Sequence, residues 1–243
     1  MTTATGMNET KVSNAMRINR DQITSMLEMQ SGMNAKVNPA WLDAGYPFLR
    51  AVVVEGGEAM DHKGWKWWKH QEADLPQVQM ELVDIWHFLL SAILIEARGD
   101  IKAAAEWVEK RIAALDGQEA RKAWIFEKEY RLDNMDPIEK LELLIGFSVF
   151  RKISIPLFDA ILEDGQMSWQ DLFRQYIGKN VLNFFRQDFG YKTGSYRKHW
   201  HDGREDNVHL VEILAELNDD SDNFKEKLYA AMQVRYGVGG SAQ

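Results

Sequence analysis

Two pairs of acidic residues in otherwise apolar segments restrict most strongly how this chain can fold. Glu55 and Glu58 are three positions apart, and so are Glu81 and Asp84. Residues three apart on a helix lie on the same face, one turn from each other. If the two segments form consecutive antiparallel helices, four carboxylates converge, and their repulsion then requires protons or cations. The pattern therefore predicts two packed helices with a charged centre between them.

The chemistry of such a centre follows from its ligands. Oxygen ligands favour hard cations, so we expect Mg²⁺, with Mn²⁺ as a possible substitute. Mg²⁺ commonly combines few carboxylates with water and substrate phosphates, which predicts a phosphorylated substrate. Two alternatives remain open at this point. Each acidic pair could lie on a solvated helix face, or Asp84 and His87 could belong to a di-iron centre, although the chain contains no Glu-x-x-His.

Helix caps and stop signals recur along the rest of the chain. They predict an all-α fold, a single-domain helical bundle with antiparallel metal-binding helices and with loops at 63–75 and 190–207. Residues 1–20 are expected to be a flexible arm, 21–236 the domain, 100–165 a less recognisable helical insert and 237–243 a frayed tail. The expected helices run from Asp21 to just beyond Gln30, Phe48–His62, from the Asp74 cap to Arg98, from Asp100 to near Gly117, from the Asp136 cap, from Ser168 to before Gly190, Val208–Leu217 and Asn223–Val234.

Composition excludes several classes of protein. The chain has 243 residues, 37 Asp and Glu against 29 Lys and Arg, and no cysteine. The formal charge of −8 argues against a duplex nucleic-acid binder, and the missing cysteines exclude disulfides and thiolate zinc sites. The longest uncharged stretch, 85–95, is about half of what a membrane span needs. We expect a cytoplasmic protein with no direct nucleic-acid partner and no membrane partner.

The loop between the acidic helices and a later helix carry aromatic and basic residues. Trp65, Trp67 and Trp68 lie within four positions, between Lys63 and Lys69. They could be a hydrophobic plug, or an aromatic wall beside the metal with lysines directed at phosphate. Spacings of four and three place Lys179, Asn183 and Arg186 in one polar stripe, and residues 190–198 follow with glycines, tyrosines and cations that suit a polyphosphate.

Taken together, these blocks resemble the dimeric, all-α dUTPase family. The resemblance is carried by the Glu-Gly-Gly-Glu at 55–58, the tryptophan-rich segment 62–69, the segment 81–88, the block 178–192 and the Glu-Asp-Asn at 205–207, all in the family's order. Upstream, Gln30 and Asn34 also fit the family pattern. The similarity spans roughly residues 30–207 and is weakest at about 100–165.

The resemblance implies hydrolysis of dUTP, and also of dUDP, to dUMP by a homodimer. It implies that Glu55, Glu58, Glu81 and Asp84 hold Mg²⁺, and that an activated water attacks the α-phosphorus while Glu55 orients or deprotonates that water. The implied uracil pocket consists of Gln30, Asn34, His87, Phe88 and Asn183. Lys179, Arg186, Tyr191 and Lys198 would bind phosphates, with Lys66 or Lys69 as a further contact, and Trp67 and Asn207 are weaker substrate-binding assignments.

Two other functions stay open. A related all-α pyrophosphatase could prefer another base, such as that of dCTP, and a panel of nucleotides would distinguish it. A nucleotide-responsive regulatory protein on the same scaffold, with an unknown protein partner, is the non-enzymatic alternative. The intact acidic quartet argues against a scaffold without metal, because clustered unpaired carboxylates are costly.

Overall fold

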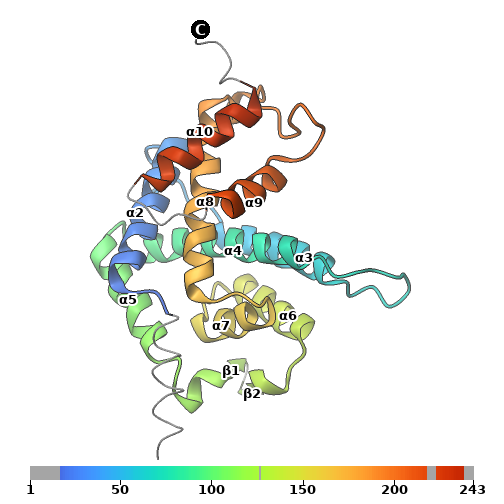
Figure 1. Ribbon diagram of the computed structural model, residues 1–243. Coiled ribbons are helices and arrows are strands. Elements are labelled where there is room, and N and C mark those ends of the chain that lie inside the picture. Colours follow the sequence, from blue (N-terminus) through green and yellow to red (C-terminus); the bar gives the residue numbers. More distant parts are fainter. Residues whose placement is uncertain (1–16, 126, 218–222, 238–243) are drawn as a thin grey trace, which may run out of the picture.

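The computed structural model describes residues 17–125, 127–217 and 223–237. The chain is mainly helical, as predicted, and Figure 1 shows the helices crossing in a bundle. The elements are α2 (Arg20–Val37), α3 (Phe48–Lys63), α4 (Leu75–Glu96), α5 (Ile101–Ala113), η1 (Gln118–Arg121), β1 (Lys122–Ile125), β2 (Lys128–Arg131), η2 (Leu132–Asn134), α6 (Pro137–Val149), α7 (Ile155–Asp164), α8 (Trp169–Asp188), η3 (Tyr191–Thr193), α9 (Asp206–Glu216) and α10 (Phe224–Tyr236).

The two acidic helices, α3 and α4, lie side by side, and α3 also packs on α6 (Figure 1). A side chain at Gly56 would come within 2.9 Å of Ile145 on α6, so glycine permits this close contact. Helix α4 is apolar and long enough to cross a membrane, but 78% of its most apolar window is buried inside the fold. Its Trp86 stacks on Phe158 with ring centroids 5.2 Å apart, which identifies α4 as the central core helix.

Helix α8 joins this core to the C-terminal part of the chain. It packs against α2, α4, α9 and α10, and it passes across α4 in Figure 1. Phe185 of α8 contacts Trp200 and Tyr236 in a second apolar cluster. The loop that precedes α9 is therefore anchored to α8 and α10 by aromatic packing.

Most predicted helix boundaries are close to the observed ones, with a few corrections. Asp136 and Ser168 form capping boxes at α6 and α8. The cap of α2 is Asn19 rather than Asp21, because its side chain accepts a hydrogen bond from Gln22 N. Ile18 is already buried, so the fold begins before residue 21. The remainder of the expected arm, 1–16, and the tail at 238–243 lie outside the described residues.

Two elements of the 100–165 segment had no prediction. Helix α7 is capped by Ser154 and has a proline in its first turn, but its ten residues are short and apolar. Strands β1 and β2 form an antiparallel hairpin of four residues each. Its turn contains Glu127 at φ 66° instead of the Asn-Gly or Asp-Gly that usually signals a hairpin.

Candidate active site

Three of the four predicted acidic residues form one group. Glu55 on α3 and Glu81 and Asp84 on α4 each offer a carboxylate oxygen, and these oxygens all lie within 4.8 Å of one another. The predicted convergence of the two helices is therefore present. Glu58, one turn further along α3, has an exposed side chain outside this group. Its role as a metal ligand stays a prediction that requires its side chain to turn inward.

The group is short of positive charge. Burial and the neighbouring Asp84 carboxylate raise the pKa of Glu55 and of Glu81 well above the ordinary value. Lys179 Nζ lies 2.8 Å from Asp84 Oδ2, and His62 Nε2 lies 3.7 Å from Glu81 Oε1. One buried lysine and one histidine cannot neutralise three converging carboxylates with a further acid, Glu58, nearby.

The donor set fits a hard divalent cation. Carboxylate oxygens suit Mg²⁺ or Mn²⁺, and within the described ranges the group contains no histidine. His87, which the di-iron alternative needed, is 2.8 Å from Val83 O through Nδ1 and stacks on Tyr176 with ring centroids 4.1 Å apart. Because His87 is not part of the group formed by Glu55, Glu81 and Asp84, the described residues do not support a di-iron centre.

Three of the residues predicted for the uracil pocket, Gln30, Asn34 and His87, belong to one hydrogen-bond network. Gln30 Nε2 donates to Asn34 Oδ1 at 3.1 Å and to Ser91 Oγ at 2.9 Å, while Tyr176 Oη donates to Gln30 Oε1 at 3.0 Å. Ser91 Oγ in turn donates to His87 O. Sequence reasoning missed Ser91 and Tyr176. Each lies about one turn from a predicted residue, Ser91 after His87 and Tyr176 before Lys179, and this spacing was the available signal.

One polar atom in this network has no hydrogen-bond partner among the described residues. His87 is buried, and its Nε2 makes no hydrogen bond with the described residues. Burial lowers the pKa of His87 to about 4, so the ring is neutral near pH 7. Because Nδ1 faces a carbonyl and must carry the proton, Nε2 is a buried acceptor without a donor. The adjacent Phe88 is half-buried against the core.

The basic stripe on α8 is present, but acidic residues already engage its cations. Lys179 Nζ contacts Asp84 and also donates to Asn207 Oδ1 at 3.0 Å. Arg186 pairs with Asp206, and its Nη1 donates to Asn183 Oδ1 at 3.2 Å. The stripe therefore links the acidic centre on α4 to the start of α9.

Comparison with known families agrees with this geometry. A family model described as dUTPase matches residues 22–191, which is most of the chain. The chain belongs to the dUTPase family. It is accordingly an enzyme that hydrolyses dUTP, as the sequence predicted. The match includes both acidic helices and the α8 stripe, and it ends before Lys198 and Asn207. No curated protein gives a significant match.

Other predicted contacts of this enzyme lie farther from the acidic group. Tyr191 is exposed, and the Arg186 guanidinium lies 5.9 Å from its ring centroid. Lys198 Nζ is 3.1 Å from Glu205 Oε2. Both belong to the loop between α8 and α9, so their approach to a nucleotide stays a prediction.

The tryptophan-rich loop is not a plug in the core. Trp67 is 88% exposed, and Trp65 and Trp68 are also exposed and pack edge-on in a chain of three rings. Lys66 forms an ion pair with Asp61, and Lys69 is exposed. The loop therefore presents its aromatic rings to the outside, and the plug interpretation is wrong.

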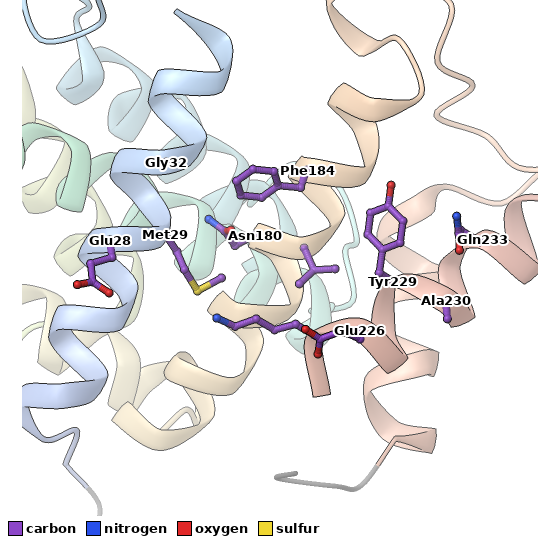
Figure 2. Close-up of a pocket in the computed structure, with 11 residues that line it drawn as sticks. Glu28, Met29, Gly32, Asn180, Phe184, Glu226, Tyr229, Ala230 and Gln233 are labelled. Carbon is purple, nitrogen blue, oxygen red and sulfur yellow. The ribbon is translucent and has the colours of Figure 1, made fainter. Parts of the chain in front are cut away.

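A cavity of about 640 Å³ lies between α2, α8 and α10 of this dUTPase. Figure 2 shows Met29, Phe184 and Tyr229 around it, with Asn180 between α2 and α8. Asn180 and Phe184 lie on a different face of α8 from Lys179 and Asn183, since successive residues turn by about 100°. None of its lining residues was predicted to bind metal or nucleotide.

Proposed function

We propose that the acidic centre holds Mg²⁺, or Mn²⁺ as a substitute, and that the enzyme converts dUTP to dUMP and pyrophosphate. The observation that carries this proposal is the convergence of Glu55, Glu81 and Asp84 with too little positive charge around them. A divalent cation bound there would neutralise phosphoryl oxygens and supply a water of lowered pKa. The enzyme would also accept dUDP and release phosphate.

Glu55 is the proposed catalytic residue. Its carboxylate lies among those of Glu81 and Asp84, where it would orient a water and accept its proton as the water attacks the α-phosphorus. Glu81 and Asp84 would be ligands, and Glu58 would complete the set from α3. Lys179 Nζ contacts Asp84, so it would also reach a phosphate oxygen that is bound beside Asp84. There it would stabilise the charge on the leaving pyrophosphate.

The base would bind beside His87, Phe88 and Asn183. Neutral His87 has an unpaired acceptor, Nε2, which matches the N3–H donor of uracil and not the N3 acceptor of cytosine. Asn183 uses its Oδ1 for Arg186 and keeps its amide N–H groups for a base carbonyl. Gln30 and Asn34 would hold the pocket in shape through Ser91, and Phe88 would stack on the ring.

The phosphates would lie along the α8 stripe. Lys179, Tyr191 and Lys198 are the proposed contacts, together with the Nη1 edge of Arg186, which Asp206 leaves open. Asn207 would contact the nucleotide from α9. Trp67 and either Lys66 or Lys69 would approach from the loop between the acidic helices.

The homodimer implied by the resemblance is also a proposal. An apolar recess of about 300 Å³ lies at the start of α3, where Tyr46 and Val54 are exposed. An exposed apolar surface of this kind supports association with a second copy. Sedimentation of the purified protein would test it, and a monomer at every concentration would contradict it. The cytoplasmic location stays a prediction.

The test of the function is pyrophosphate release from dUTP, dCTP, dTTP and UTP, with Mg²⁺ or with EDTA. We expect turnover of dUTP that EDTA and Glu81→Gln abolish. Equal turnover of dCTP would refute the proposed role of His87 Nε2. The pocket is also proposed to be too tight for the methyl group of thymine, and dTTP turnover close to that of dUTP would refute this. A regulatory protein without activity would turn over none of them.

A further inference from the structure

Asp206, the first residue of α9, is a buried carboxylate that accepts three side-chain hydrogen bonds from the described residues. It is 0% exposed, and it accepts hydrogen bonds from Arg186 Nε at 2.8 Å, Arg186 Nη2 at 2.9 Å and Tyr196 Oη at 2.8 Å. Burial alone would raise its pKa, but the Arg186 guanidinium outweighs burial and lowers it. An acid this buried cannot contact substrate, so any part that it plays in the reaction acts through its partners.

The first partner, Arg186, connects Asp206 to two asparagine side chains of the predicted site. Asp206 holds one edge of the guanidinium and thereby fixes its plane. From that fixed plane, Nη1 donates to Asn183 Oδ1 at 3.2 Å and Nη2 donates to Asn207 Oδ1 at 3.3 Å. Both amides are thus oriented with their oxygens toward arginine and their N–H groups away from it. Asn207 Oδ1 also accepts from Lys179 Nζ, which contacts Asp84 of the acidic centre.

The second partner, Tyr196, connects Asp206 to the loop between α8 and α9. Trp200 Nε1 donates to Tyr196 Oη at 3.1 Å, and the Tyr196 ring stacks on Tyr236 with centroids 5.4 Å apart. The backbone N–H of Asp206 donates to Lys198 O at 3.0 Å. The segment that carries Lys198 is therefore held by the same residue that holds Arg186.

We propose that Asp206 is a positioning residue for dUTP hydrolysis, which fixes Arg186 so that Asn183, Asn207 and the Lys198 segment meet the nucleotide in one arrangement. This inference rests on the proposed nucleotide-binding roles of Asn183 and Asn207. Asp206 lies beyond the part of the chain matched by the dUTPase family, whereas Arg186 and Asn183, two of the residues that it would orient, lie within that part.

The decisive experiment compares Asp206→Asn, Arg186→Met and the double variant. Asp206→Asn keeps the size of the side chain and removes its charge. We expect KM for dUTP to rise about tenfold or more, the cost of weakening a charge-assisted hydrogen bond. Mn²⁺ affinity should be unchanged, because the acidic centre is intact. If Asp206 acts through Arg186, the double variant is no worse than Arg186→Met alone.

Asp188→Asn is the matched control. Like Asp206, Asp188 pairs with a cation, Lys36, and accepts a hydrogen bond from a tyrosine, Tyr229. Unlike Asp206, it is exposed, at the end of α8, and it is not among the predicted site residues. Its KM should equal that of the wild type. Additive effects of the Asp206 and Arg186 substitutions, or an unchanged KM in Asp206→Asn, would overturn the proposal.

A second variant keeps the test valid if Asp206→Asn does not fold. Tyr196→Phe removes one hydrogen bond from Asp206 and leaves the ion pair intact. We expect KM to rise about twofold to fivefold, since one of three hydrogen bonds to the Asp206 carboxylate is lost while both bonds from Arg186 remain. An unchanged KM in this folded variant would overturn the proposal. Absence of Mg²⁺-dependent dUTP turnover in the wild type would instead refute the proposed function, so the two failures are distinguishable.

Discussion

The acidic centre and the basic stripe lie next to each other and balance their charges in opposite ways. In the centre, Glu55 and Glu81 are partly or fully buried and have raised pKa values, with Lys179 as the closest ammonium group. In the stripe, Arg186 has its own buried counter-ion in Asp206. The stripe is therefore assembled by the protein alone, whereas the centre is arranged for a cation from outside.

The two regions are therefore expected to contribute differently to folding stability and to activity. A buried ion pair such as Arg186–Asp206 is costly to break, because removing one partner leaves a buried charge. Three crowded carboxylates gain from losing a charge while no metal is bound. Removing an acid of the stripe should thus lower the free energy of unfolding, whereas removing an acid of the metal-free centre should not. Measurements of stability and activity can test this contrast.

The largest expected effect is on activity in the acidic centre. Glu81→Gln should lower kcat/KM for dUTP about 10³-fold or more, because the metal site supplies several kcal/mol of transition-state stabilisation. The metal-free variant should be at least as stable as the wild type near pH 7, since glutamine stays neutral without the proton that folded Glu81 has to keep. Glu96→Gln, an exposed acid on the same helix, is the control for both assays. A folded Glu81→Gln enzyme with near-normal turnover would contradict the assignment.

The next effect is on stability in the stripe. Asp206→Ala should lower the free energy of unfolding by about 3–5 kcal/mol, because the Arg186 guanidinium then stays buried without its counter-charge. Urea denaturation of the metal-free protein measures this loss. If Asp206→Ala and Glu81→Gln changed stability equally, the two regions would not differ as described.

A smaller effect is the pH dependence of the metal-free protein. The pKa of Glu55 is raised from 4.5 to about 7 and that of Glu81 to about 8, so the folded chain keeps protons that the unfolded chain has released. Stability should therefore fall as pH rises from about 4.5 to about 8. Thermal melts in EDTA across this range test it. Glu81→Gln or saturating Mg²⁺ should flatten the slope, and a flat wild-type profile would refute the proposed electrostatics.

The smallest effect is expected in the loop that joins the acidic helices. Trp67 is 88% exposed, so Trp67→Ala should change the free energy of unfolding by less than about 0.5 kcal/mol. A loss of activity with unchanged stability would support its predicted contact with substrate. A large loss of stability would show that the ring packs on the fold after all.

Local sequence signals predicted much of the fold. The capping boxes at Asp136 and Ser168 and the Gly99 stop, with φ 80°, need only neighbouring residues. Helix α7 and the β1–β2 hairpin could not be predicted in this way, because both are short. Their stability depends on packing against the rest of the bundle.

The candidate site also has residues that local sequence patterns could predict and residues that they could not. The spacing of Glu55, Glu81 and Asp84 was sufficient to predict that they meet, because helix geometry and one antiparallel contact determine it. The importance of Asp206 was not readable. Asp202, Glu205 and Asp206 look alike in sequence, and the return of the chain onto α8 decides that the last one is buried against Arg186.

Direct metal binding tests the central claim, that Glu55, Glu81 and Asp84 form a centre completed by a divalent cation. Mn²⁺ would be titrated into the protein with a non-hydrolysable dUTP analogue, and free Mn²⁺ followed by electron paramagnetic resonance. We expect Mn²⁺ to bind to the wild type and to Glu96→Gln, and its affinity for Glu55→Gln to be weakened about tenfold or more. Equal Mn²⁺ binding by Glu55→Gln and the wild type, or no binding by either, would contradict it.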